Sequence, residues 1–338
     1  MVVNTILLGN NLETLKTIPD QSVNCCVTSP PYYGLRDYGI DNQIGLEETP
    51  QEYIEKLVDI FREVKRVLRN DGTLWLNIGD SYAGSGKGGS PNKEKSKQAI
   101  NKGSLTIGNL YEDDGKIIER RKKINVTSKT FEGIKAKDLI GIPWMLAFAL
   151  RADGWYLRQD IIWSKPSVMP ESVKDRFCKS HEHIFLLSKE QRYYFDHKYA
   201  LEPATGYDGR KDTVMKGSAK YADGATGLTQ QTFLSRGHER WTEDDNGNYM
   251  RTRRDVWVVA SDPSELAHFA MYPQKLILPC VMCGCPENGV VLDPFMGSGT
   301  TGLVAIKNFR KYIGCEINPE YKEIAEKRIS NERGLFNE

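Results

Sequence analysis

Residues 23–32 read VNCCVTSPPY, an apolar run that leads into the pentapeptide TSPPY. The apolar run predicts a buried strand that ends at this pentapeptide. Pro30 and Pro31 fix their own φ angles and carry no N–H, so carbonyl oxygens serve there as acceptors, while Tyr32 offers a flat aromatic face. A loop of this kind suits a planar amine. The stretch therefore predicts a reaction centre at the carboxyl end of a strand.

A second informative stretch, residues 290–301, reads VVLDPFMGSGTT and predicts a strand, a glycine turn and the start of a helix. Gly297 and Gly299 let the backbone approach a ligand, and the first amides of the following helix face it. Glu316 follows Asp293 by 23 residues, close to the spacing of about 20 residues at which an acidic side chain meets ribose hydroxyls. The stretch therefore predicts a site for a nucleoside cofactor.

Together the two stretches resemble the amino-group DNA methyltransferases of the beta class, in which a TSPPY or DPPY motif precedes the glycine-rich cofactor motif. The resemblance covers most of residues 3–80 and 138–330. It implies an α/β fold with a Rossmann-like, S-adenosylmethionine-dependent methyltransferase sheet, circularly permuted so that the catalytic half comes first. It also implies double-stranded DNA as the partner. A cognate restriction endonuclease, and the choice between monomer and homodimer, stay open.

The resemblance also carries site residues over to this chain. It implies a catalytic role for Ser29, Pro30, Pro31 and Tyr32. It implies cofactor contacts for Asn10, Tyr272, Lys275, Asp293, Pro294, Phe295, Gly297, Ser298, Gly299, Thr300 and Glu316. No metal is expected at this site.

The lone pair of an exocyclic base amine is delocalised into the ring, so acceptors must localise it toward the methyl sulfonium. The Ser29 hydroxyl and the Pro30 carbonyl are the expected acceptors, Tyr32 is expected to stack on the base, and transfer proceeds by direct displacement. The base must be flipped out of the duplex to reach such a pocket. Serine in place of aspartate at position 29 favours cytosine N4 as the target, with adenine N6 as the alternative.

Other functions also fit parts of the sequence. Residues 297–302, GSGTTG, match the dinucleotide pattern G-x-G-x-x-G, although a dehydrogenase has no use for TSPPY. Pro279 and Cys280 form a Pro-Cys pair like the nucleophile of carbon-5 cytosine methyltransferases, but their place on an apolar helix favours a packed thiol. A methyltransferase of another substrate and a DNA-binding module with a decayed pocket are the remaining alternatives.

Net charge is only +1, so any nucleic-acid binding depends on local clusters of basic residues. Residues 85–137 hold 13 Lys or Arg against 6 Asp or Glu, which fits either a solvated loop or a segment that contacts the DNA backbone. Residues 204–252 are rich in Gly, Thr, Asp and Tyr without periodicity and predict an inserted recognition segment. The expected DNA-contacting side chains are Arg176, Arg236, Arg240, Trp241 and Arg253.

The predicted organisation has three parts: a catalytic half over 1–203 with a basic insert at about 84–137, a target-recognition insert over 204–252, and a cofactor-binding half over 253–338. Alternation of strands and helices predicts a mainly parallel sheet covered on both faces. One helix is expected to run through Leu68 and to be stopped by residues 70–72. Another helix is expected over 139–152.

The composition indicates a reduced, cytoplasmic protein. The chain has 338 residues, of which 39% are hydrophobic, and no stretch approaches the roughly 18 apolar residues of a membrane span. The N-terminus lacks a signal-peptide pattern. Cys25, Cys26 and Cys315 lie in apolar strands and are expected to be packed thiols. Zinc binding by Cys280, Cys283 and Cys285 with Cys178 and His181 is a minor alternative, because the spacing lacks a second ligand pair.

Overall fold

The computed structural model describes residues 1–35, 40, 42–84, 131, 133–204, 242–243, 249–261 and 272–333. The chain divides into two compact units, one formed by Met1–Asp196 with Asp255–Glu338 and the other by His197–Arg254. Most of the basic insert and most of the predicted recognition insert lie outside the described residues.

The first unit is built on an eight-stranded sheet. Its spatial order is β1 (Thr5–Leu8), β11 (Lys311–Glu316), β10 (Val290–Asp293), β2 (Val23–Thr28), β3 (Leu68–Ile78), β5 (His181–Ser188), β4 (Tyr156–Ser164) and β9 (Val256–Val258). Neighbouring strands run parallel except where β5 pairs antiparallel with β3 and β4. The prediction of a mainly parallel sheet is therefore confirmed.

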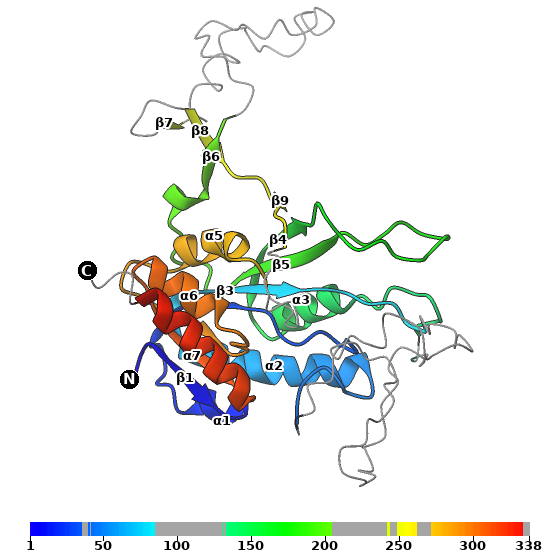
Figure 1. Ribbon diagram of the computed structural model, residues 1–338, viewed down its shortest axis with the longest axis horizontal. Coiled ribbons are helices and arrows are strands. Elements are labelled where there is room, and N and C mark those ends of the chain that lie inside the picture. Colours follow the sequence, from blue (N-terminus) through cyan, green and yellow to red (C-terminus); the bar gives the residue numbers. More distant parts are fainter. Residues whose placement is uncertain are drawn as a thin grey trace, which may run out of the picture. The chain divides into compact units, whose positions relative to one another are not determined.

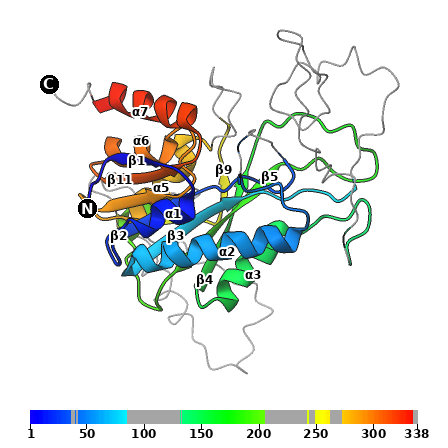
Figure 2. The same cartoon turned by 90° about the horizontal axis from the view of Figure 1, so that it is seen from below.

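Within the described part of the chain, helices cover both faces of the sheet (Figures 1 and 2). One layer consists of α1 (Asn11–Lys16), α2 (Pro50–Val67) and α3 (Ile142–Ala152), and the other of α5 (Gln274–Gly284), α6 (Thr300–Lys307) and α7 (Pro319–Arg333). Because both faces are covered, β2 is buried along nearly its whole length. The carboxyl ends of β2 and β10, which carry the two predicted motifs, therefore meet at one edge of the sheet.

Two helix boundaries differ from the predicted ones. Helix α2 ends at Val67, and Leu68 already pairs with Val23 as the first residue of β3. The register between β2 and β3 then shifts, so Asn70, Asp71 and Gly72 lie at an irregularity inside the strand and do not end the helix. The backbone of Leu68 pairs with β2 and its side chain is buried, so the strand begins before the turn-forming residues, which are accommodated as an irregularity.

The second difference lies at the start of α3, which begins at Ile142 and not at Leu139. Gly141 adopts a left-handed φ of 86°, which breaks the helix before it. The Asp80 carboxylate accepts hydrogen bonds from the Gly141 and Ile142 amides at 3.0 and 3.1 Å. A carboxylate thus caps a helix start whose N-cap residue has no side chain.

The second unit holds a short 3-10 helix, His197–Ala200, and a three-stranded antiparallel sheet. Its strand order is β6 (Leu201–Pro203), β8 (Tyr249–Thr252) and β7 (Thr242–Glu243). An ion pair of 2.9 Å between Arg251 and Glu202 links β8 to β6. Strands β7 and β8 lie within the segment that lacked periodicity in the sequence, and β6 directly precedes it.

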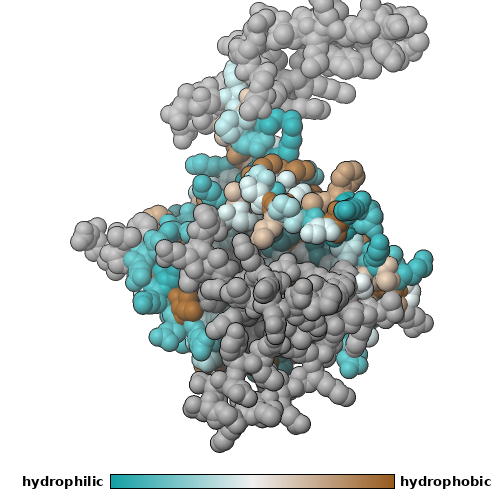
Figure 3. Space-filling view, turned by 45° about the vertical axis from the view of Figure 1, so that its right-hand side comes forward, coloured by the Kyte–Doolittle hydropathy of each residue, from teal (hydrophilic) through white to brown (hydrophobic). Residues whose placement is uncertain are grey.

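Hydrophilic residues dominate the coloured surface on the face shown in Figure 3, and hydrophobic side chains gather in separate small patches. Within the ranges given above, none of the helices is both long and apolar enough to span a membrane. Cys25, Cys26 and Cys315 are buried free thiols, which confirms their predicted packing.

Candidate active site

The two motifs meet because β2 and β10 are neighbours in the sheet. Cys26 pairs with Leu292 in parallel register, which brings Thr28 and Asp293 side by side at the strand ends. The Thr28 hydroxyl donates a 2.6 Å hydrogen bond to Asp293 Oδ1. TSPPY and the glycine turn therefore start from one hydrogen-bonded pair of residues.

Asp293 is the centre of a buried network. Its carboxylate also accepts hydrogen bonds from the Phe295 amide at 3.0 Å, from the Tyr272 hydroxyl at 3.1 Å and from the Thr301 hydroxyl. Burial raises the pKa of Asp293, and these donors act in the opposite direction. The side chain joins β10, the start of α6 and the TSPPY strand, but it does not line the cavity described next.

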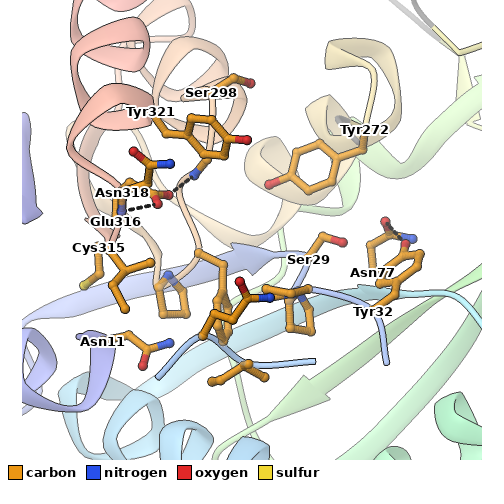
Figure 4. Close-up of a pocket in the computed structure, with 18 of the residues that line it drawn as sticks. Asn11, Ser29, Tyr32, Asn77, Tyr272, Ser298, Cys315, Glu316, Asn318 and Tyr321 are labelled. Atoms are coloured by element: carbon orange, nitrogen blue, oxygen red, sulfur yellow. Dashed lines mark hydrogen bonds between the residues drawn. The ribbon is translucent and has the colours of Figure 1, made fainter. Parts of the chain in front are cut away.

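A cavity of about 750 Å³ opens at this edge of the sheet, within the range of roughly 300–1,000 Å³ that is usual for small-molecule sites. It collects most of the predicted site residues. Its walls include Asn10, Ser29, Pro30, Pro31, Tyr32, Tyr272, Pro294, Phe295, Gly297, Ser298 and Glu316. Figure 4 shows Ser29 and Tyr32 on one side of the cavity, Glu316 and Asn318 on the other, and Tyr272 pointing toward the space between them.

Glu316 forms the glycine-motif side of the cavity. One carboxylate oxygen accepts the Gly297 amide at 2.7 Å and the other accepts the Asn318 amide at 2.8 Å (Figure 4). Gly297 has a φ of 52°, which glycine adopts without strain. Burial raises the pKa of Glu316, and the backbone donors oppose that shift. The Gly297 and Asn318 amides thus fix the Glu316 carboxylate at the cavity wall.

Tyr32 forms the opposite side. Its hydroxyl donates to Glu182 Oε2 at 2.5 Å and lies 3.1 Å from Asn77 Oδ1. Lys165 Nζ pairs with the other oxygen of Glu182. Burial, and then the neighbouring Glu182 carboxylate, raise the pKa of Tyr32, so the phenol keeps its proton. The loop before it is anchored as well, because the Tyr53 hydroxyl donates to the Pro31 carbonyl at 2.8 Å.

The remaining predicted residues lie elsewhere. Gly299 and Thr300 follow the glycine turn without lining the cavity, and Lys275 is exposed on α5, where its neighbour Gln274 lines the cavity instead. Arg176 pairs with Glu171 and stacks on the Tyr82 ring at 3.9 Å, outside the cavity walls. Arg253 belongs to the second unit, and Arg236, Arg240 and Trp241 lie outside the described residues.

Several cavity residues escaped the sequence prediction, among them the polar side chains Asn77, Lys165 and Glu182. Asn77 is near the end of β3, Lys165 directly follows β4, and Glu182 is near the start of β5. No short motif marks them, because each reaches the cavity through strand pairing between segments that are far apart in the sequence. What the three share is position, since each lies at or next to one end of a strand.

The structure also bears on the two cysteine alternatives, a nucleophilic Cys280 and a zinc site. Cys280 is fully buried in α5, as expected for a packed thiol, and Cys283 and Cys285 are buried beside it, whereas Cys178 is exposed. Across the described ranges, no three His, Cys, Asp or Glu side chains are grouped so that they could hold a metal ion.

Comparisons with known proteins agree with this geometry. A family model described as DNA methylase matches residues 23–327. The Type II methyltransferase M.Cfr9I of Citrobacter freundii is 42% identical over 97% of this chain and 88% of its own length. M.XycI of Xanthomonas campestris pv. cyanopsidis is 41% identical over the same shares of the two chains.

A solved structure of similar fold is the cytosine-N4-specific PvuII DNA methyltransferase, with a TM-score of 0.58, 18% identity and coverage of 100% of this chain and 94% of that one. The family match spans both motifs and the sheet between them. The chain therefore belongs to the DNA methylases of the N6/N4 methyltransferase family.

Proposed function

We propose that this protein transfers a methyl group from S-adenosylmethionine to the exocyclic N4 amine of cytosine in duplex DNA. The observation that carries the proposal is that TSPPY and the glycine turn line the same cavity. A methyl donor and an acceptor base must meet within bonding distance, and one cavity with two chemically different ends allows this. Membership in the family supports DNA as the substrate.

The glycine-motif end fits the nucleoside part of the cofactor. Glu316 presents a carboxylate to two vicinal hydroxyls, Asn10 also lines the cavity, and Phe295 and Tyr321 add aromatic surface. The Asp293 carboxylate positions Phe295 at this end by accepting a hydrogen bond from its amide. Bound there, S-adenosylmethionine supplies an electrophilic methyl group. Roles for Lys275, Gly299 and Thr300 in holding it are part of the proposal.

The TSPPY end fits a planar amine. The Ser29 hydroxyl and the Pro30 carbonyl would accept the amine hydrogens and direct its lone pair toward the methyl group. Tyr32 would stack on the base, and its hydroxyl is already held by Glu182 and Asn77, so its ring would not need to reorganise. The base would have to enter the cavity beside Ser29 and Tyr32, which a base stacked inside a duplex cannot do, so it would be flipped out.

Cytosine N4 is favoured over adenine N6 because position 29 is serine. Both amines pose the same chemical problem, and adenine N6 is the alternative target. The circular permutation inferred from motif order is part of this proposal, as is target recognition by the insert over 204–252 and by Arg253. The Type II names of the relatives suggest that a restriction endonuclease acts on the same sequence.

The test is a product analysis. The purified protein is incubated with methyl-labelled S-adenosylmethionine and mixed-sequence duplex DNA, and the DNA is digested to nucleosides that are identified by mass. Label in N4-methylcytosine is the expected result. Label in N6-methyladenine would keep the mechanism and change the base, and no label in DNA would refute the proposal.

A further inference from the structure

Glu182 is the centre of a polar cluster on the TSPPY side of the cavity. Its two carboxylate oxygens have different partners: Oε2 accepts the Tyr32 hydroxyl at 2.5 Å, and Oε1 pairs with the Lys165 ammonium. The side chains of Glu182 and Lys165 are only 14% and 21% exposed. A charged pair has thus been withdrawn from water beside the predicted reaction centre, at a cost that a purely structural contact seldom repays.

Asn77 contacts this carboxylate directly, and Trp163 contacts its partner Lys165. Asn77 Nδ2 donates to the His183 carbonyl at 3.1 Å and lies 3.4 Å from Glu182 Oε2. Lys165 Nζ lies 4.1 Å from the centroid of the Trp163 ring, which holds the ammonium in place from its other side. Glu182 is therefore preorganised before any substrate binds.

Methylation of an amine creates a positive charge on nitrogen and leaves one proton to be removed. Serine at position 29 supplies a hydroxyl, which is a weak base, where other members of the resembling class carry a carboxylate. Among the described residues that line the cavity, Glu182 and Glu316 are the carboxylates. Glu316 lies at the glycine-motif end of the cavity, where one oxygen accepts the Gly297 amide and the other accepts the Asn318 amide that follows β11. The carboxylate on the Tyr32 side is Glu182.

We propose that Glu182 is the catalytic base of this reaction, an inference that rests on the proposed function. The new N–C bond forms as the S–C bond of the methyl donor breaks and leaves its electron pair on sulfur. The proton lost from the amine nitrogen passes to the Glu182 carboxylate, which also stabilises the positive charge that develops on nitrogen. Lys165 is a positioning residue, because it acts by holding Glu182.

The experiment measures single-turnover methyl transfer by the full-length protein, with labelled S-adenosylmethionine and a duplex that the wild type methylates. Glu182→Gln keeps the size of the side chain and is expected to slow transfer about 100-fold, with cofactor affinity unchanged. Glu190→Gln is the control, since Glu190 is exposed beyond the other end of β5 and does not line the cavity.

Chemical rescue separates a base from a structural residue. Glu182→Ala is expected to regain rate when formate is added, in proportion to the formate concentration. Lys165→Met should lower kcat and leave KM for the cofactor unchanged, whereas Lys165→Arg, which keeps the positive charge, should lose less of the rate than Lys165→Met.

Two outcomes would overturn the assignment: a Glu182→Gln rate equal to that of the wild type, or a loss that formate does not restore and that accompanies weaker cofactor binding. A wild-type protein that does not label DNA at all would instead refute the proposed function, and this inference with it.

Discussion

Thr28 and Asp293 are separated by 265 residues in the sequence and joined by a 2.6 Å hydrogen bond between side chains that are fully or almost fully buried. Each is the last residue of its strand, and each is followed by one of the two motifs that line the cavity. The bond therefore sets the distance between the two ends of the site. Their geometry depends on a buried polar contact as well as on the sheet.

Replacement of Thr28 by valine tests this contact. Thr28→Val keeps the shape of the side chain but removes the donor, so the buried Asp293 carboxylate loses one of its partners. We expect the free energy of unfolding to fall by about 1–3 kcal/mol in urea denaturation. Thr28→Ser retains the hydroxyl and should lose less. Equal stabilities of the valine and serine variants would show that the hydrogen bond contributes nothing.

The raised pKa of Asp293 predicts a dependence of stability on pH. Because burial raises this pKa in the folded state, the folded protein binds the proton more tightly than the unfolded chain does. The resulting stabilisation is present below the unfolded pKa of about 3.9 and is lost as pH rises through the raised folded pKa.

Asp293→Asn removes this titration. The free energy of unfolding of the wild type, minus that of Asp293→Asn, should therefore decrease as pH rises above 4, which urea denaturation at several pH values measures. A difference that stays constant, or that increases with pH, would contradict the assigned direction.

Sequence patterns predicted the strands and the two motifs because their signals are local. The apolar run before TSPPY and the glycine turn after Asp293 each appear within a dozen residues. The start of α3 was missed because it depends on Asp80, which is distant in the sequence and caps the helix with its carboxylate. A helix end that is set by a tertiary contact leaves no periodic signal.

The cavity residues likewise fall into those that local sequence signals reveal and those that depend on tertiary contacts. Ser29, Tyr32 and Glu316 could be chosen from motifs, whereas Glu182 and Lys165 reach the cavity only because β5 pairs antiparallel between β3 and β4. Alternation of strands and helices predicts parallel neighbours and does not predict this reversal. Residues that depend on strand order were therefore beyond the sequence prediction.

A double replacement in TSPPY separates chemistry from cofactor binding. Ser29→Ala with Tyr32→Ala removes one acceptor and the stacking ring but leaves the glycine-motif end of the cavity intact. We expect methyl transfer to DNA to be abolished while S-adenosylmethionine binding, measured by calorimetry, is retained. Unchanged turnover would refute the catalytic role of the motif.

Gly79 makes room for the Tyr32 ring. A Cβ atom added at Gly79 would lie 2.6 Å from Tyr32 Cε2, and the ring cannot move away without breaking its hydrogen bond to Glu182. Gly79→Ala should therefore cost about 1–3 kcal/mol of stability and slow methyl transfer. In a Tyr32→Ala background the stability cost should disappear. If it persists, the clash is with another group.

Cofactor affinity should depend on the ionisation of Glu316. A carboxylate that accepts ribose hydroxyls binds best when ionised, and burial raises the pKa of Glu316 above its ordinary value. Affinity for S-adenosylmethionine should therefore be constant near neutral pH and fall as pH decreases through the raised pKa, at a higher pH than an exposed glutamate with a pKa of about 4.3 would produce.

Glu316→Gln should bind more weakly at neutral pH and lose this dependence, while Glu320→Gln, an exposed neighbour at the start of α7, should match the wild type. Equilibrium binding titrations from pH 4 to 8 measure all three proteins. A pH dependence that survives in Glu316→Gln would assign the titration to another group and remove the ribose role from Glu316.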